Sequence, residues 1–155
     1  MTAPLPTRPD GLWADDLAVG QTFISRTVDV SSDDIVEFAQ RYDPQTFHLD
    51  DAAARGTFFD GLVGSGWHTA ALTMRLFTEA LPIATGIVGA GVDLTWPSAM
   101  VAGDVLHLEG TIDDITFSKS RPDRAIVVAS HQTLNQHGEA RQRSTARLLA
   151  WKRPD

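Results

Sequence analysis

The spacing of apolar residues changes once along the chain, which separates a helical first half from a β-rich second half. At 35–42 and again at 67–81 apolar residues recur every three or four positions, the period of a helix that packs on its neighbours, and the segment between them is rich in loops. From Val88 onward apolar and polar residues alternate, so that every second side chain faces the same side of a sheet. The pattern predicts a protein of the α+β class.

Two helices stand out in the first half. The first is expected to begin after Ser31, a good N-cap residue, and to end by Asp43, because Pro44 disfavours helix at the residue before it. A shorter helical stretch is expected at 50–55. The second long helix is expected at 66–81, and apolar residues cover nearly its whole circumference. A helix that is apolar on all sides is expected to be buried.

The second half predicts a sheet of about five strands when an earlier β-rich segment is included. The expected strands are 22–30, 88–96, 106–112, 125–134 and 145–151. An antiparallel sheet with one apolar face and a single apolar helix are best buried by wrapping the sheet around the helix, which is the hot-dog architecture. Because one sheet of five strands cannot enclose the helix, we expect a homodimer, or a higher oligomer, in which a second copy covers the rest.

The first residues differ in composition from the rest of the chain. Residues 1–12 contain three prolines and a glycine, so they are expected to form an extended arm, and residues 13–155 a single domain. No signal peptide and no apolar run of membrane-spanning length is recognisable, which predicts an unprocessed protein that does not associate with membranes.

The amino-acid composition of the chain argues against several classes of function. The net charge of −7 and pI near 5.0 provide no basic surface for a phosphate backbone, so nucleic acid is not an expected partner. The absence of cysteine excludes disulfides, thiolate metal sites and a cysteine nucleophile, and it fits a reducing compartment. We therefore expect a cytoplasmic protein.

Residues with acid-base chemistry are concentrated where the first helix ends. Asp43 is followed after four residues by His48, and four glycines lie between residues 56 and 66, the last of them at the start of the long helix. A carboxylate and an imidazole that contact the same water can take up and return a proton. Amides at a helix N-terminus can stabilise a negatively charged oxygen.

The segment from Phe38 to Asp50, followed by Gly64-Ser65-Gly66-Trp67-His68-Thr69, resembles the MaoC-like dehydratase and (R)-specific enoyl-CoA hydratase family. The resemblance implies a hot-dog fold and a hydro-lyase that adds water to, or removes it from, an acyl thioester. Asp43 and His48 would activate one water and the Gly66 amide would stabilise the enolate. Which of the two side chains is acid and which is base stays open. No cofactor is expected besides coenzyme A as part of the substrate.

The resemblance also suggests substrate contacts. Phe47 and Trp67 lie beside the motif residues, and Ser65 is either a substrate contact or the N-cap of the long helix. Arg121 and Arg124 are candidates for binding the phosphates of coenzyme A, or else belong to a solvated loop.

The remaining histidines have other expected roles. His68, one turn into the long helix, is expected to be a core or interface residue. The other three, His107, His131 and His137, fall on strands or a turn and are expected to be exposed. No paired-histidine spacing suggests a metal site.

Two other functions fit the same fold. A hot-dog thioesterase would hydrolyse the thioester, and the acid it needs near the long helix would have to be Glu79. A subunit that binds acyl thioesters without catalysis is the third possibility, because fold alone does not determine function.

Overall fold

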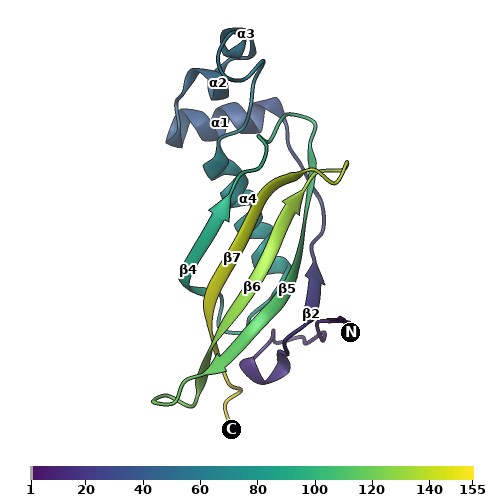
Figure 1. The fold of residues 1–155 in the computed structure, drawn as a ribbon, viewed down its shortest axis with the longest axis vertical. Coiled ribbons are helices and arrows are strands. Elements are labelled where there is room, and N and C mark those ends of the chain that lie inside the picture. Colours follow the sequence, from purple (N-terminus) through teal and green to yellow (C-terminus); the bar gives the residue numbers. More distant parts are fainter. Residues whose placement is uncertain (1) are drawn as a thin grey trace.

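A computed structural model describes residues 2–155 of the chain (Figure 1). The helical segments are η1 (Ala14–Asp16), α1 (Ser32–Tyr42), α2 (Thr46–Leu49), α3 (Asp51–Ala54) and α4 (Gly66–Ala80). The strands are β1 (Ala3–Pro4), β2 (Gln21–Ile24), β3 (Val28–Asp29), β4 (Val88–Thr95), β5 (Val105–Phe117), β6 (Arg124–Leu134) and β7 (Ala140–Trp151). The α+β class and the hot-dog arrangement are confirmed, with α4 packed against one face of the sheet.

One sheet contains all the strands. Its order is β1-β2-β5-β6-β7-β4, with β3 also pairing with β5, and every pairing is antiparallel except that of β1 with β2. The predicted strand 22–30 is divided, because the chain leaves the ladder between β2 and β3. Since β4 follows α4 directly and pairs only with β7, its other edge is free among the described residues.

The core lies between α4 and the sheet. Leu76 and Phe77 of α4 pack against alternate side chains of the long strands, all of them buried. These strand residues are Leu106, Leu108, Ile112, Val127, Ala129, Leu148 and Ala150. The alternation along β5, β6 and β7 therefore determines which face of the sheet covers the helix.

Helix α4 is not buried on all sides within the single chain. Trp67 and Met74, which share one face of the helix, are 61% and 44% exposed. Several apolar side chains of β4, including Val88 and Val92, are also exposed. The sheet covers only one side of α4, so an apolar surface of α4 and β4 faces solvent.

The N-terminal segment is part of the packed structure. Ala3 and Pro4 pair with β2, and Leu12 is buried in the core, where its N–H donates to Pro82 O at 2.7 Å. The segment is mostly extended, and its residue Leu12 packs in the core of the domain.

The helices α1, α2 and α3 form a tip beyond one end of the sheet (Figure 1). The structure adds α2 to the helices that the sequence pattern indicated. No helix within residues 2–155 has both the length and the hydropathy required to cross a bilayer.

Candidate active site

Helix α1 positions Asp43. Its N-terminus is fixed by a capping box, in which Ser31 Oγ accepts from Asp34 N at 3.1 Å and Asp34 Oδ2 accepts from Ser31 N at 3.1 Å. Asp43 is the C-cap, and its N–H donates to Ala39 O at 2.9 Å. The carboxylate therefore lies at the point where Pro44 ends the helix.

The short helix α2 positions His48. The His48 N–H donates to Gln45 O at 2.9 Å, and its side chain is only 6% exposed. Its Nδ1 lies 2.7 Å from Val63 O. Because a carbonyl oxygen only accepts, Nδ1 carries a proton, and Nε2 is the nitrogen that gains or loses one.

The two predicted side chains meet. His48 Nε2 lies 3.3 Å from Asp43 Oδ2. A neutral imidazole would direct the lone pair of Nε2 at this carboxylate, so the contact is favourable only when a proton lies between the two groups. The pair is arranged to share a proton, either directly or with a water that contacts both groups.

Asp43 is kept ionised by its neighbours. Partial burial raises its pKa, but hydrogen bonds from the Ser65 hydroxyl and the Gln45 amide, together with the nearby His48, outweigh this and hold the pKa below its usual value. The carboxylate is half-buried, and Gln45 Nε2 donates to its Oδ1 at 2.7 Å.

The third predicted group, Gly66, begins α4 beside the tip. Ser65 is the N-cap, since its Oγ accepts from Trp67 N at 3.2 Å, and His68 N donates to Ser65 O at 3.0 Å. The Gly66 N–H has no acceptor among the described residues and belongs to the first turn, where amides lack intrahelical partners. A free donor backed by the helix dipole is available there.

The neighbouring Trp96 explains why residue 66 is a glycine. A Cβ at this position would lie 2.7 Å from ring atoms of Trp96, so the indole fills that space. Trp96 also packs edge-on against Trp67, with ring centroids 5.3 Å apart. The two tryptophans form one wall beside the helix N-terminus.

The predicted substrate contacts do not all lie in one place. Phe47 packs edge-on against the His48 ring at 4.6 Å, and Trp67 is exposed beside Trp96. Ser65 is completely buried, and its hydroxyl both caps α4 and bonds to the Asp43 carboxylate.

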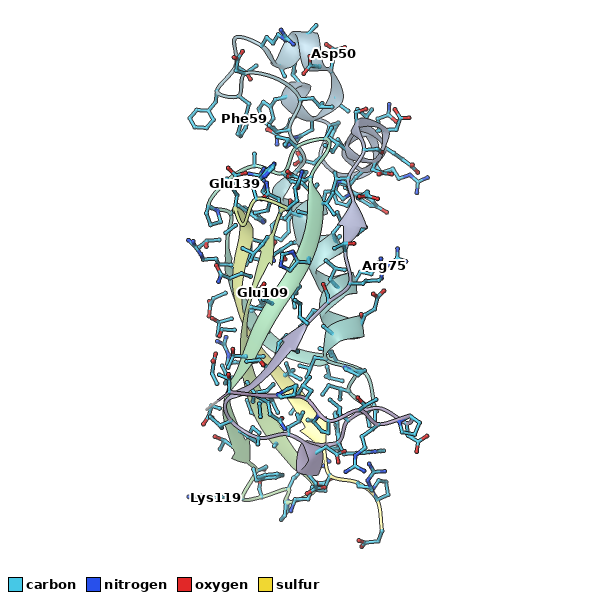
Figure 2. All side chains as sticks on the ribbon, turned by 90° about the vertical axis from the view of Figure 1, so that its right-hand side faces the viewer. Asp50, Phe59, Arg75, Glu109, Lys119 and Glu139 are labelled. Atoms are coloured by element: carbon cyan, nitrogen blue, oxygen red, sulfur yellow. The ribbon has the colours of Figure 1, made fainter. Side chains whose placement is uncertain are left out.

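Arg121 and Arg124 lie away from this group within one chain. Their loop joins β5 to β6 at the end of the sheet opposite the tip, where Figure 2 shows the neighbouring Lys119 far from Asp50. Arg124 forms two hydrogen bonds with Asp123, at 3.2 and 2.9 Å, and lies over the Trp151 ring.

Two further histidines are buried outside the pair. His68 stacks on Phe38 at 4.7 Å, and burial lowers its pKa. The expectation that His131 is exposed is wrong: it faces α4, stacks on Phe77 at 4.4 Å, and burial lowers its pKa to about 4. It shares the buried face of β6 with Ala129 and Thr133.

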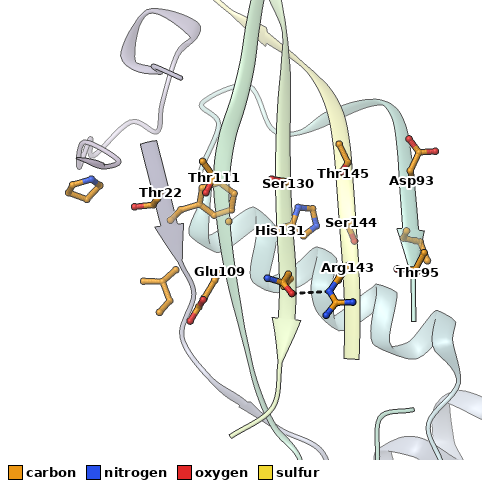
Figure 3. Close-up of a pocket in the computed structure, with 16 residues that line it drawn as sticks. Thr22, Asp93, Thr95, Glu109, Thr111, Ser130, His131, Arg143, Ser144 and Thr145 are labelled. Carbon is orange, nitrogen blue, oxygen red and sulfur yellow. Dashed lines mark hydrogen bonds between the residues drawn. The ribbon is translucent and has the colours of Figure 1, made fainter. Parts of the chain in front are cut away.

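The structure has a hollow away from the Asp43 and His48 pair. It has a volume of about 780 Å³ and is on the outer face of the sheet. Residues of β2, β4, β5, β6 and β7 line it, most of them polar, around a hydrogen bond from Arg143 to Gln132 (Figure 3). None of Asp43, His48 and Gly66 lines it. A polar outer face is expected for a sheet covered by a helix on one side only, so the volume of this hollow does not indicate an active site.

The fold and the paired Asp43 and His48 define a class: hot-dog proteins with a carboxylate and an imidazole in contact near the start of the central helix. The family model of the MaoC like domain matches residues 16–132, which is more than half of the chain. The chain belongs to the MaoC-like dehydratase family.

Three known proteins are similar to this chain. A MaoC-like dehydratase from Rhodospirillum rubrum is 55% identical, with 94% of this chain and 100% of that chain covered and a TM-score of 0.91. The R-hydratase PhaJ1 from Pseudomonas aeruginosa shares the fold at 24% identity, with 92% and 88% covered and a TM-score of 0.74. The uncharacterized protein YdeM of Bacillus subtilis is 38% identical over 65 residues, which are 42% of this chain and 46% of that relative.

Gln45, Val63 and Trp96 are site residues that the sequence did not predict. Gln45 had a local signal, because it lies between Asp43 and His48 in the motif. The carbonyl of Val63 and the ring of Trp96 had none, since both reach the site through contacts distant in the sequence.

Proposed function

We propose that the protein is a hydro-lyase that adds water to an enoyl thioester, or removes it from a 3-hydroxyacyl thioester. The observation that supports this best is the 3.3 Å contact between His48 Nε2 and Asp43 Oδ2, with the opposite imidazole nitrogen fixed on Val63 O. An acid-base pair oriented in this way can take one proton from a water and deliver another.

In the hydration direction, the oxygen of a water held by the pair bonds to C3 of the enoyl group. One proton of that water passes to the pair, and the electrons of the double bond move toward the thioester oxygen. The pair then returns a proton to C2, so that H and OH are added across the double bond. Because one water and one pair supply both groups, addition to the same face is expected.

The negative charge on the thioester oxygen needs a donor. We assign this role to the free N–H of Gly66, at the start of α4. Loss of a comparable donor in other enzymes costs about 3 to 4 kcal/mol of transition-state stabilisation. We also propose coenzyme A as the carrier, and no cofactor or metal; both remain predictions, as does the cytoplasmic location.

The exposed apolar surface of α4 and β4 supports the expected homodimer. It includes Trp67, Met74 and Val92, and it continues onto the free edge of β4. A second copy related by a two-fold axis would present the same apolar surface and pair the two β4 edges. The acyl chain would then lie beside α4, covered by the second copy.

Light scattering after size exclusion tests the dimer. The wild type is expected at twice the chain mass and Val92→Asp at the mass of one chain. Val19→Asp, at an exposed apolar residue in the turn before β2, should leave the dimer intact. A monomeric wild type at micromolar concentration would contradict the dimer.

Activity separates the proposal from its two alternatives. With crotonyl-CoA and longer enoyl-CoA esters, loss of the conjugated absorbance without release of free thiol is expected. Thiol release would indicate a thioesterase, which is disfavoured because Glu79 is bound to Arg26 at 2.6 and 3.1 Å. Tight binding of acyl-CoA without turnover over a broad panel would indicate the non-catalytic subunit.

A further inference from the structure

Gln45 contacts both members of the acid-base pair. Its backbone N–H donates to Asp43 O at 2.8 Å, and its carbonyl accepts from His48 N at 2.9 Å. Its side-chain amide donates to Asp43 Oδ1 at 2.7 Å. One residue therefore connects the end of α1, the start of α2 and the carboxylate.

The carboxylate of Asp43 has three polar partners, because the Ser65 hydroxyl also bonds to it. Oδ1 accepts from Gln45, and Oδ2 faces His48. A carboxylate with one oxygen fixed cannot rotate freely about its Cβ–Cγ bond, so the other oxygen keeps its direction. The donated proton also favours the ionised form, and Gln45 is among the groups that lower the Asp43 pKa.

The Gln45 side chain lies outside the pair and is exposed to solvent. It bonds to the Asp43 oxygen that does not face His48, so it is not placed to contact the proton that the pair shares. A hydrogen bond to a charged group is stronger than one between neutral groups. At the surface the donor gives up a hydrogen bond to water, so only part of that strength is retained.

We propose that Gln45 is a positioning residue, which holds Asp43 ionised and directs its Oδ2 at the proton shared with His48. This inference rests on the proposed hydration reaction. It predicts that an isosteric loss of the amide weakens catalysis most at low pH, where an unsupported carboxylate becomes protonated first.

The test compares Gln45→Met, which keeps the length and removes the donor, with the wild type across a pH series using crotonyl-CoA. At the acid end of the profile kcat/KM is expected to fall about ten-fold, the effect of one charge-assisted hydrogen bond, and at pH 8 clearly less. Gln45→Glu should fall further, because a second carboxylate faces Asp43. Gln40→Met, an exposed glutamine on α1, is the matched control and should follow the wild type.

A second measurement does not depend on turnover. The Asp43 carboxyl carbon, followed by NMR, should titrate at higher pH in Gln45→Met than in the wild type, with no change in Gln40→Met. Unchanged titration and an unchanged pH profile in Gln45→Met would overturn the role of Gln45, even if the wild type hydrates crotonyl-CoA. A shifted titration in a protein that turns over no thioester would instead overturn the proposed function and leave the role of Gln45 standing.

Discussion

The tip of the molecule and the interior of the sheet each bury a histidine, and the two environments have opposite consequences. His48 in the tip and His131 on β6 are similarly inaccessible, at 5% and 6% exposed. His48 has a carbonyl on one nitrogen and a carboxylate near the other, whereas Nδ1 of His131 has no partner among the described residues. Burial alone makes a histidine neutral and inert, and it is the two oxygen partners that make His48 suited to proton transfer.

The largest expected effect comes from disabling the pair in the tip. Asp43→Asn keeps the shape of the side chain but cannot take up a proton, so kcat with crotonyl-CoA should fall about 10²- to 10⁴-fold. His131→Leu, which removes the other buried imidazole, should leave kcat within about two-fold of the wild type. Steady-state kinetics on both variants checks this contrast, and equal activities of the two would remove the distinction between the regions.

The next effect concerns stability at acid pH. The pKa of His131 is near 4 in the folded protein and 6.5 when unfolded, so the unfolded state binds the proton more readily. The contribution of neutral His131 to the free energy of unfolding is fully present above pH 6.5. It is lost as the pH falls toward 4, and it amounts to about 3 kcal/mol for a pKa shift of this size. His68, whose pKa is also lowered by burial, acts in the same direction.

Urea unfolding of the wild type and of His131→Leu at pH 7.5, 5.5 and 4.5 measures this contribution. The variant should lose less stability over that range. Carboxylates with a lowered pKa, such as Asp104, contribute mainly at lower pH, because their stabilisation is lost only below the unfolded value of 3.8. Parallel losses in the two proteins would show that His131 is not the group that titrates.

A smaller effect is expected where the tip joins α4. In Gly66→Ala the new Cβ would lie 2.7 Å from the Trp96 ring, and overpacking of this kind costs about 1 to 3 kcal/mol. The same substitution in a Trp96→Leu background should cost much less. A double-mutant cycle from denaturant unfolding gives the coupling between the two positions. Absence of coupling would mean that the glycine is required for another reason.

The smallest effect is expected at the beginning of α1. Ser31→Ala removes the N-cap of the helix that carries Asp43, and the expected loss of stability is about 1 kcal/mol. Thermal unfolding measures it. Because the cap lies at the far end of α1 from Asp43, kcat should change little, and a large loss of activity would show that the whole helix must be rigid for the pair to function.

The sequence predicted those features that short segments determine. The position of Asp43 at the end of α1 follows from Pro44, which ends the helix. The position of Gly66 follows from the start of the long helix whose N-cap is Ser65. The strands β4 to β7 follow from alternation. The burial of His131 was not predicted, although His131 lies on the alternating buried face of β6, because histidine is more often exposed.

Features that depend on contacts between distant segments were not predictable. The carbonyl of Val63 that fixes the tautomer of His48 belongs to an irregular loop without periodicity. The exposed face of α4 looked buried because its residues are apolar, and hydropathy does not distinguish a core from a surface that another molecule covers. The position of Arg121 and Arg124 away from the pair depends on the length of β5, which the sequence underestimated.

The central claim is that Asp43 and His48 deliver both parts of one water to one face of a double bond. It is tested most directly by hydration of crotonyl-CoA in D₂O, with the configuration at C2 and C3 of the product determined by NMR. Deuterium at C2 and hydroxyl at C3 added to the same face is the predicted result. Addition to opposite faces, or no hydration by a folded, dimeric wild type, would contradict the account.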